Sequence, residues 1–278
     1  MIKRKDFSDN QEFLNYNKDI IRNNYFSFYA SIMAMMSVPQ IMRLYNVYDK
    51  HKNTAYCMWY TGNYNIHSFA WNEEIIDSLS VEIELNKYNN FAFSGQRDLI
   101  IRLLTKNQIA YEIIKDRLIY ECKKMLFSFD VAAGHLTKAT TADLEELSQM
   151  SFQYHQEEYK GNGQRDLAYM SGIVKNGIQN GTMYKLSVDN KICSMAQVMS
   201  ADFNFPLIGQ LFTKAEHRNH GYASAILGKL TEQLLTEGHK KVGLLGDVEN
   251  PAALKVFEKI GYQEIYKHIL VKTGQRQI

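Results

Sequence analysis

The most informative stretch of this sequence is Leu211-Phe212-Thr213-Lys214-Ala215-Glu216-His217-Arg218-Asn219-His220-Gly221-Tyr222-Ala223. It begins in an apolar run, residues 206–213, that predicts a strand, and it ends in a helical pattern over residues 222–237. Where a strand leads into a helix, unpaired amide N–H groups and the positive end of the helix dipole point at one spot. An anion, above all a pyrophosphate, is the natural ligand of such a junction.

Individual residues of this junction fit that ligand. Gly221 lets the backbone approach a bound group closely, small Ala223 leaves room against the helix start, and Arg218 can add a charge-assisted contact. The same residues also fit a turn glycine and a solvated surface arginine, so the junction alone leaves both interpretations open. Spacing excludes two other phosphate loops. A Rossmann fingerprint needs three spaced glycines, and a Walker loop needs Ser or Thr after Gly228-Lys229, where leucine follows.

The residues around the junction predict a regular order of elements in the second half of the chain. We expect strands at 136–139, 183–188, 192–200, 206–213, 242–248, 262–266 and 269–272, and helices from about 140, over 164–179, over 222–237 and from Asn250-Pro251 to Gly261. A strand, helix, strand succession requires a crossover, so strands 206–213 and 242–248 are expected to lie parallel in one sheet.

The first half of the chain gives weaker signals. Residues 9–36 and 96–105 favour helices, and residues 55–60, 66–71, 91–94 and 124–131 favour strands. These element types loosely mirror the second half. A small-residue break near Gly134 then suggests two related domains, residues 1–133 and residues 134–278. The fold class expected from this order is mixed α/β (α+β).

The junction resembles the acetyl-CoA-binding motif of the GNAT N-acetyltransferases, a strand followed by [Q/R]xxGx[G/A] at a helix start. A second motif of that family is similar to Asn250-Pro251-Ala252-Ala253-Leu254-Lys255-Val256-Phe257-Glu258-Lys259-Ile260-Gly261-Tyr262. The resemblance covers residues 134–272. It implies a mixed central sheet with a splayed parallel strand pair and helices on both faces. It also implies a tandem form, in which residues 1–133 are a degenerate GNAT-like half that shapes the acceptor site without binding coenzyme A.

The resemblance further implies acetyl-CoA as the cosubstrate, no metal, and direct transfer of the acetyl group to an amine. The coenzyme-binding positions that it carries over are Leu211, Phe212, Thr213, Arg218, Asn219, His220, Gly221, Tyr222, Ala223, Asn250, Ala253 and Phe257. An amide N–H near Leu211 or Phe212 would stabilise the oxyanion.

The acid and the base of the reaction are not assigned. Many family members carry tyrosine where this chain has Phe257, and phenylalanine cannot protonate the leaving thiolate. Strand 206–213 has no Asp or Glu. Gln210 could orient a water, while Asp202, Asp247 and Glu249 are nearby in sequence, and we favour none of them.

Composition restricts the remaining choices. The 278 residues carry 32 Lys+Arg against 30 Asp+Glu, a net charge of +2, which argues against a nucleic-acid partner. Three scattered cysteines without a CxxC pair argue against zinc and against a disulfide framework. A polar start and an apolar stretch that ends at Pro39 predict neither a signal peptide nor a membrane span, so a cytoplasmic protein is expected.

These observations lead to one expected function and two alternatives. The expected function is an N-acetyltransferase for a small-molecule amine or amino acid, working as a monomer or homodimer. The first alternative is a coenzyme A- or acyl-CoA-binding module that senses or regulates without catalysis. The second is acetylation of proteins.

Overall fold

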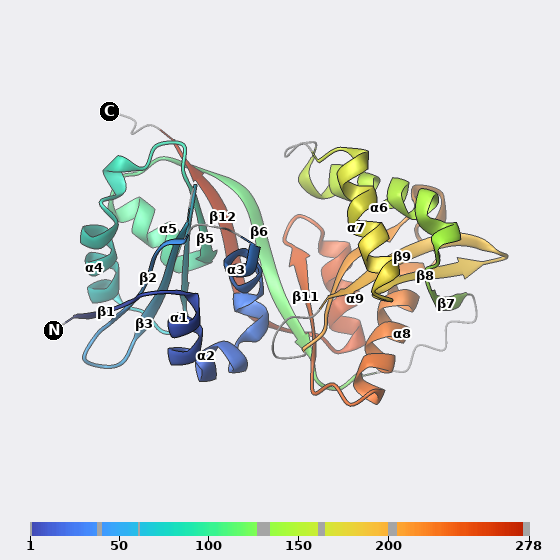
Figure 1. The fold of residues 1–278 in the computed structure, drawn as a ribbon, viewed down its shortest axis with the longest axis horizontal. Coiled ribbons are helices and arrows are strands. Elements are labelled where there is room, and N and C mark those ends of the chain that lie inside the picture. The colour runs from blue at the N-terminus through green and yellow to red at the C-terminus, as the bar shows by residue number, and fades with distance from the viewer. Residues whose placement is uncertain are drawn as a thin grey trace. The chain divides into compact units, whose positions relative to one another are not determined.

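The computed structural model describes residues 2–37, 41–60, 62–126, 134–160, 165–199 and 205–274. The chain divides into two compact units, which Figure 1 follows from blue at the N-terminus to red at the C-terminus. Unit 1 comprises Met1–Tyr120, Leu245–Pro251 and Glu264–Ile278, and unit 2 comprises Glu121–Leu244 and Ala252–Gln263. The last strand of the chain therefore belongs to unit 1.

Unit 1 is a mainly antiparallel sheet with helices. Its elements are β1 (Lys3–Phe7), α1 (Asn10–Tyr16), α2 (Lys18–Asn23), α3 (Tyr25–Ser37), β2 (Ile41–Tyr48), β3 (Thr54–Tyr60), β4 (Asn63–Ser68), α4 (Glu73–Ile83), β5 (Ala92–Gln96), α5 (Arg97–Lys106), most of β6 (Tyr111–Cys122) and of β12 (Gln263–Thr273). The strand order is β1-β2-β3-β4-β5-β12, in which β4 and β5 are parallel and α4 forms the crossover between them. Figure 1 shows β12, in red, beside β5.

The apolar faces of α4 and α5 form the core of unit 1 against the sheet. Both helices repeat apolar residues at helical spacing, and those residues are fully or almost fully buried: Ile75, Ile76, Leu79 and Ile83 on α4, and Leu99, Ile100, Leu103 and Leu104 on α5. Gly95 of β5 has a φ of 131°, and a Cβ there would overlap the carbonyl oxygen of Ile66 on β4. The two parallel strands therefore approach closely along this edge.

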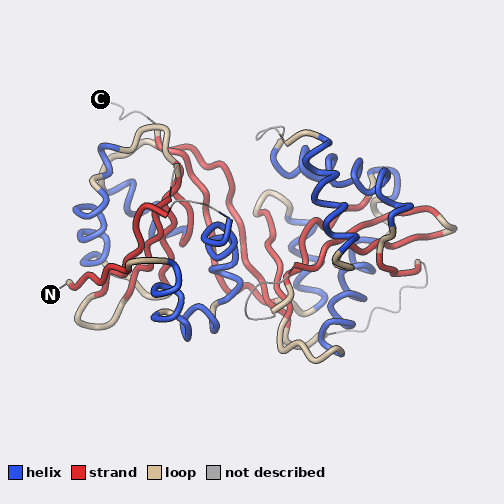
Figure 2. Tube along the Cα trace, in the orientation of Figure 1, coloured by secondary structure: helices blue, strands red, loops and turns tan. Residues whose placement is uncertain are grey.

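Unit 2 is a mixed sheet covered by helices on both faces. Its elements are β7 (His135–Lys138), α6 (Leu144–Tyr159), α7 (Leu167–Gln179), β8 (Met183–Val188), β9 (Lys191–Met199), β10 (Leu207–Thr213), α8 (Tyr222–Thr236), the first half of β11 (Val242–Asp247) and most of α9 (Pro251–Ile260). The strand order is β11-β10-β9-β8-β7, with β10 and β11 parallel. Figure 2 shows α6 and α7 packed side by side, and their apolar residues share a core with Met183, Met195 and Phe212.

Local sequence signals in unit 2 behave as predicted. Thr140 and Asp143 form a capping box before α6. Asp189 and Asn190 turn the β8–β9 hairpin with φ values of 48° and 60°, a conformation that Asp and Asn tolerate. From β7 to β12 the chain repeats the element order of β1 to β6, apart from one additional helix in the first series. The predicted mixed α/β fold class and the parallel relation of strands 206–213 and 242–248 are confirmed.

Several predicted elements are corrected. The single helix expected over 9–36 is three helices, because the chain leaves helical geometry at Asn17 and Asn24. The two closing strands are one strand, β12, since the polar pair Lys267-His268 stays in the ladder and His268 pairs with Gln96. The strand expected over 124–131 is wrong for residues 124–126, where Leu126 instead donates its N–H to Ile260. Residues 127–131 lie outside the described ranges.

Candidate functional site

β10 and β11 pair over a short stretch only. Their parallel register consists of Leu207 with Gly243 and Ile208 with Leu244. On its other side β10 pairs with β9, but the register shifts between Gly209 and Phe212, so that two residues of β10 stand against one of β9. The predicted splayed parallel pair is therefore present, and Gln210 and Leu211 at the bulge lie outside both ladder registers, whereas Phe212 pairs with Met195 of β9.

A chain of neutral polar side chains lies at the bulge. Gln210 has a φ of 48°, and Ser151 on α6 donates its Oγ–H to Oε1 of Gln210 at 2.6 Å. Nε2 of Gln210 in turn donates to Oε1 of Gln197 on β9 at 2.7 Å. Ser151 was not among the residues predicted from the sequence to belong to the site. A serine at such a buried position was the signal that sequence reasoning missed.

The predicted pyrophosphate loop connects β10 to α8 through the short 3₁₀ turn η3 (Ala215–His217). Asn219 and Gly221 both adopt left-handed backbone conformations, with φ values of 65° and 80°. Gly221 is the N-cap of α8, no side chain caps the helix, and its first turn has no acidic residue. Since the first helical bond runs from Ala225 N to Gly221 O, the N–H groups of residues 222–224 have no partner within the helix. The helix start therefore presents several N–H groups without a partner inside the helix, at the positive end of the helix dipole.

Side chains of the loop brace it from within. Arg218 donates Nε–H to the Thr213 carbonyl at 3.1 Å, and its Nη2 donates to both carboxylate oxygens of Glu157 at 2.7 and 2.9 Å. Nδ1 of His220 lies 2.7 Å from the Arg218 carbonyl oxygen, which fixes the proton on Nδ1, and its ring stacks on Tyr222 with centroids 5.7 Å apart. The guanidinium of Arg218 is thus engaged by protein groups.

The second predicted motif begins α9. Asn250 donates its N–H to the Asp247 carbonyl at 3.0 Å just before the helix, and Ala253 and Phe257 follow within it. Phe257 is buried, with its ring 6.4 Å from that of Tyr262. Burial raises the pKa of Tyr262, whose hydroxyl is hydrogen-bonded to Thr231 at 2.8 Å. Tyr262 therefore stays protonated.

The carboxylates considered as bases have different surroundings. Asp247 lies 2.5 Å from Nζ of Lys115 and accepts the N–H of Glu249 at 2.9 Å. Burial alone would raise the pKa of Asp247, but these hydrogen bonds outweigh it and hold the pKa below its usual value. A carboxylate held in this way is a weak base. Asp202 lies outside the described residues.

The corresponding strand–helix junction of unit 1, between β4 and α4, is built differently. The side chain of Asn72 caps α4 by accepting the Ile75 N–H at 3.1 Å, and Glu73 and Glu74 occupy the first turn. β4 and β5 also stay paired from Asn63–Ala92 to Ile66–Gly95. The cap, the two carboxylates and the closed strand pair leave this helix start unsuited to an anion.

The stretch Ser94-Gly95-Gln96-Arg97 places a glycine just before the start of α5 and can also be compared with the loop at 218–223. Gln96 there caps α5 by accepting the Leu99 N–H at 2.6 Å, and Arg97 pairs with Asp116. Both side chains thus have structural roles, and this stretch has no counterpart of the uncapped helix start at 221–223.

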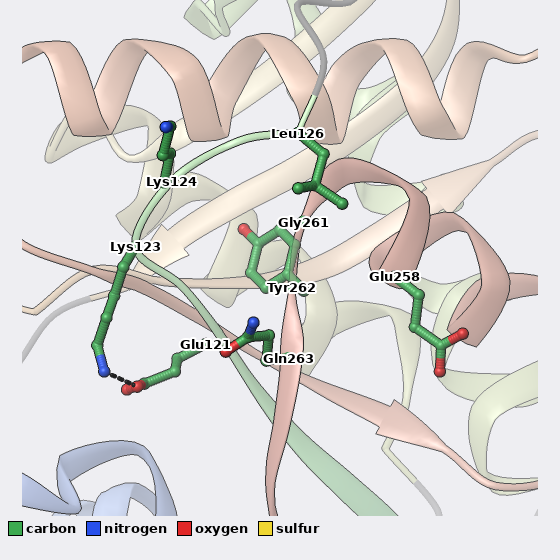
Figure 3. Close-up of a pocket in the computed structure, with 8 residues that line it drawn as sticks. All are labelled: Glu121, Lys123, Lys124, Leu126, Glu258, Gly261, Tyr262 and Gln263. Atoms are coloured by element: carbon green, nitrogen blue, oxygen red, sulfur yellow. Dashed lines mark ion pairs between the residues drawn. The ribbon is translucent and has the colours of Figure 1, made fainter.

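A pocket of about 430 Å³ lies at the C-terminal end of α9, where Figure 3 shows Glu121 paired with Lys123. None of the predicted coenzyme residues lines it. Its lining residues are Glu121, Lys123, Lys124, Leu126, Glu258, Gly261, Tyr262 and Gln263. Within the described ranges no group of three or more His, Cys, Asp or Glu side chains is placed to hold a metal ion. Among the same residues, no helix is both long and apolar enough to cross a bilayer.

Comparison with known proteins gives a consistent set of similarities. Residues 183–271, from β8 into β12, match the family model of FR47-like proteins, and this segment contains both predicted motifs. No curated protein sequence matches the chain.

Three solved structures resemble the chain over most of its length. A GNAT-family acetyltransferase from Colwellia psychrerythraea is 14% identical, with 98% of each chain covered and a TM-score of 0.63. A GCN5-related N-acetyltransferase from Sphaerobacter thermophilus is 11% identical, covering 84% of this chain and 81% of that one, with a TM-score of 0.58. A GCN5-related N-acetyltransferase from Kribbella flavida is 10% identical, covering 89% and 95%, with a TM-score of 0.55.

Proposed function

Starting from a chain that has the GNAT acetyltransferase fold, we propose that it is an acetyl-CoA-dependent N-acetyltransferase acting on the amine of a small molecule or amino acid. One observation carries the proposal, the start of α8. There Gly221 is left-handed, no side chain caps the helix, and no acid occupies the first turn. A helix start with these features favours a diphosphate over any protein side chain.

Under this proposal the coenzyme lies along β10 and the loop that follows it. The N–H groups from Asn219 to Ala223 bind the diphosphate, and the main chain of Leu211, Phe212 and Thr213 pairs with the pantetheine amides. Asn250 and Ala253 contact the pantetheine arm, and Phe257 packs near the thioester. The end of the pairing between β10 and β11 at Ile208 supports this arrangement, because the β11 side of β10 has no ladder partner beyond that residue.

The proposed reaction is a direct transfer. The amine nitrogen attacks the thioester carbonyl carbon, a C–N bond forms, and the carbonyl oxygen becomes an oxyanion that accepts an N–H at the bulge near Leu211. The tetrahedral intermediate collapses by breaking its C–S bond, and coenzyme A leaves as the thiolate. Phe257 has no hydroxyl to protonate it, so the thiolate takes its proton from solvent, which a thiol with a pKa near 8.5 tolerates. The proton of the amine passes to water next to Gln210.

The first half is proposed to bind no coenzyme. The Asn72 cap and the acidic first turn of α4 support this, because both occupy the place that a diphosphate would need. The proposed partner is a small amine acceptor, with no nucleic acid or membrane surface involved. The proposed working form is a monomer or a homodimer.

A non-catalytic sensor of coenzyme A or acyl-CoA is the second candidate. Two observations favour it: Phe257 stands where a tyrosine acid is expected, and Asp247 is tied to Lys115. Both candidates bind acetyl-CoA, so only turnover separates them. Release of the free thiol in the presence of a panel of amines supports the enzyme, and binding without release over that panel supports the sensor.

The binding step has a sharp test at Ser224, in the first turn of α8. Ser224→Asp places a negative charge beside the expected diphosphate, whereas Ser224→Asn is nearly the same size and neutral. An aspartate in a first helical turn favours the helix, so Ser224→Asp should fold as well as the parent. Calorimetry should show acetyl-CoA affinity falling at least about tenfold in Ser224→Asp only. Equal affinity in both variants would contradict the proposal that the diphosphate binds at the start of α8.

A further inference from the structure

Helix α6 makes three side-chain contacts with residues 210–218, the segment that carries the proposed coenzyme site. Glu146 pairs with Lys214, Ser151 donates to Gln210, and Glu157 pairs with Arg218. The first of these contacts is a single-point ion pair. The last is a two-oxygen contact with Arg218, the residue at the start of the loop, and it comes from the final turn of the helix.

Arg218 joins three parts of the structure. Its Nε–H bonds the carbonyl of Thr213 at the end of β10, and its Nη2 bonds Glu157 on α6. Its own carbonyl oxygen meets Nδ1 of His220 further along the loop. The guanidinium carbon also lies 5.5 Å from the centre of the Phe212 ring. A side chain held by a backbone carbonyl, a carboxylate and an aromatic face has little freedom to turn toward a ligand.

The loop needs such a restraint because of its backbone. Asn219 has a φ of 65° directly after Arg218, and Gly221 has a φ of 80° two residues later. The left-handed region is less favourable for asparagine than for glycine, so the loop keeps its N–H groups convergent only if neighbouring contacts fix its ends. The contacts of Arg218 fix the first end, and the helix itself fixes the second.

We propose that Glu157 is a positioning residue for coenzyme binding: through its bidentate ion pair it holds Arg218 as a brace of the diphosphate loop, and the Arg218 side chain does not contact the diphosphate. This inference rests on the proposed function. It assigns a role to a residue on α6, which lies outside both sequence motifs.

The two possible roles of Arg218 predict opposite effects of one substitution. If the guanidinium were a phosphate ligand, Glu157 would compete with the coenzyme for it, and Glu157→Gln would tighten binding or leave it unchanged. If Arg218 is a brace, Glu157→Gln loosens the loop and weakens binding. The sign of the change therefore separates the roles without any structural information on the complex.

The experiment measures acetyl-CoA affinity by calorimetry for the parent chain, Glu157→Gln, Arg218→Gln and the double variant. We expect each single variant to weaken binding about fivefold, the factor that an exposed ion pair of good geometry is worth, and the double variant to be no weaker than Arg218→Gln. For an active enzyme the KM for acetyl-CoA should rise by the same factor, with kcat unchanged. Tighter or equal binding in Glu157→Gln overturns the proposal, and so do independent, multiplying effects of the two substitutions.

Glu73→Gln is the matched control. Glu73 and Arg102 form a similarly exposed ion pair in unit 1, with distances of 2.7 and 3.1 Å, and Glu73 also lies 3.0 Å from Nζ of Lys106, so this substitution removes at least as much ion pairing away from the loop. It should leave acetyl-CoA affinity unchanged. A parent chain that binds no acetyl-CoA contradicts the proposed function itself, whereas a parent that binds and a Glu157→Gln variant that binds equally well contradict only the role of Glu157.

Discussion

Ser151 on α6 donates its hydroxyl to Oε1 of Gln210 over 2.6 Å, and that glutamine occupies the left-handed bulge position of β10. The carboxamide is held on its other side by Gln197. All three groups are neutral over the whole pH range in which proteins are stable. In the proposed enzyme the amine therefore meets the hydrogen-bonded side chains of Ser151, Gln210 and Gln197, none of which is a titrating base.

Wild-type turnover should accordingly follow the ionisation of the acceptor. The rate at subsaturating amine should rise tenfold per pH unit below the pKa of the acceptor, and the inflection should move when an acceptor with another pKa is used, since only the free amine attacks. The measurement is kcat/KM for the amine against pH with two acceptors of different pKa. An inflection that stays at one pH for both acceptors would instead identify a base on the enzyme.

Gln210→Glu tests the effect of adding a base to these hydrogen-bonded side chains. Ser151 can still donate to the new carboxylate, and the Gln197 amide can rotate to donate its Nε2–H, so the substitution fits the existing hydrogen bonds. Burial raises the pKa of such a carboxylate and the hydrogen bonds from Ser151 and Gln197 lower it, so that it is ionised near neutral pH and can accept the amine proton. We expect kcat/KM at pH 7 to increase by about tenfold or more. Gln210→Met, which offers no base, should show no increase.

Binding stoichiometry tests the difference between the two strand–helix junctions. Of these two described junctions, the start of α8 is open to a diphosphate, whereas Asn72 and two glutamates occupy the start of α4. Calorimetric titration of the full chain should give a stoichiometry of about one acetyl-CoA per chain. Ser224→Asp should then weaken binding at this single site by at least about tenfold, and a second class of sites in either titration would show that α4 also binds the coenzyme.

The second half of the fold could be predicted because its signals are local. The helical spacing of α8, the Asp189-Asn190 turn and the Asn250-Pro251 start of α9 each depend on neighbours in sequence. The first half was harder. α4 was missed although its Asn72 cap and its apolar spacing are local signals. β12, which lies late in the sequence but completes the sheet of unit 1, was divided in two because its partner β5 lies far away in the sequence, with Ile269 opposite Gly95. A ladder between such distant residues leaves no mark on local periodicity.

The candidate site divides along the same line. The loop from Arg218 to Ala223 could be located from spacing and resemblance, since its backbone conformation depends on a glycine at a helix start. The contacts of Arg218 could not be predicted, because Glu157 lies 61 positions away on another helix. Gln210 was noted for its type alone. The bulge places Gln210 between Ser151 and Gln197, and no residue pattern in β10 predicts this bulge.

Two buried histidines of unit 1 should make the protein sensitive to acid. Nε2 of His67 lies 2.8 Å from Ser31 Oγ, and its ring centroid is 6.3 Å from that of His268. Burial, reinforced by His268, lowers the pKa of His67. Burial, with the charge of Arg117, lowers the pKa of His268 to about 3. Above the unfolded-state pKa of about 6.5 both rings are neutral in both states and stability is complete.

As pH falls from about 6.5 toward 3, the unfolded chain binds protons that the folded histidines do not. The free energy of unfolding should therefore decrease by up to about 1.4 kcal/mol per pH unit for each histidine. Urea unfolding between pH 7.5 and 4.5 measures this slope. His268→Leu should flatten the slope by about one histidine's share. An unchanged slope in that variant would mean that His268 does not contribute to the acid sensitivity.

We expect the ion pair of Lys115 and Asp247 to stabilise the folded protein. We do not expect Asp247 to act as the catalytic base. Their side chains are only 6% and 11% exposed, and removing one partner leaves the other charge buried. Lys115→Met should lower the free energy of unfolding by about 3 kcal/mol, whereas Lys115→Met combined with Asp247→Leu should recover most of that loss because no charge remains unpaired. Urea unfolding at pH 7 measures both. In the double variant, acetyl transfer per folded molecule should persist, and its loss together with restored stability would identify Asp247 as part of the chemistry.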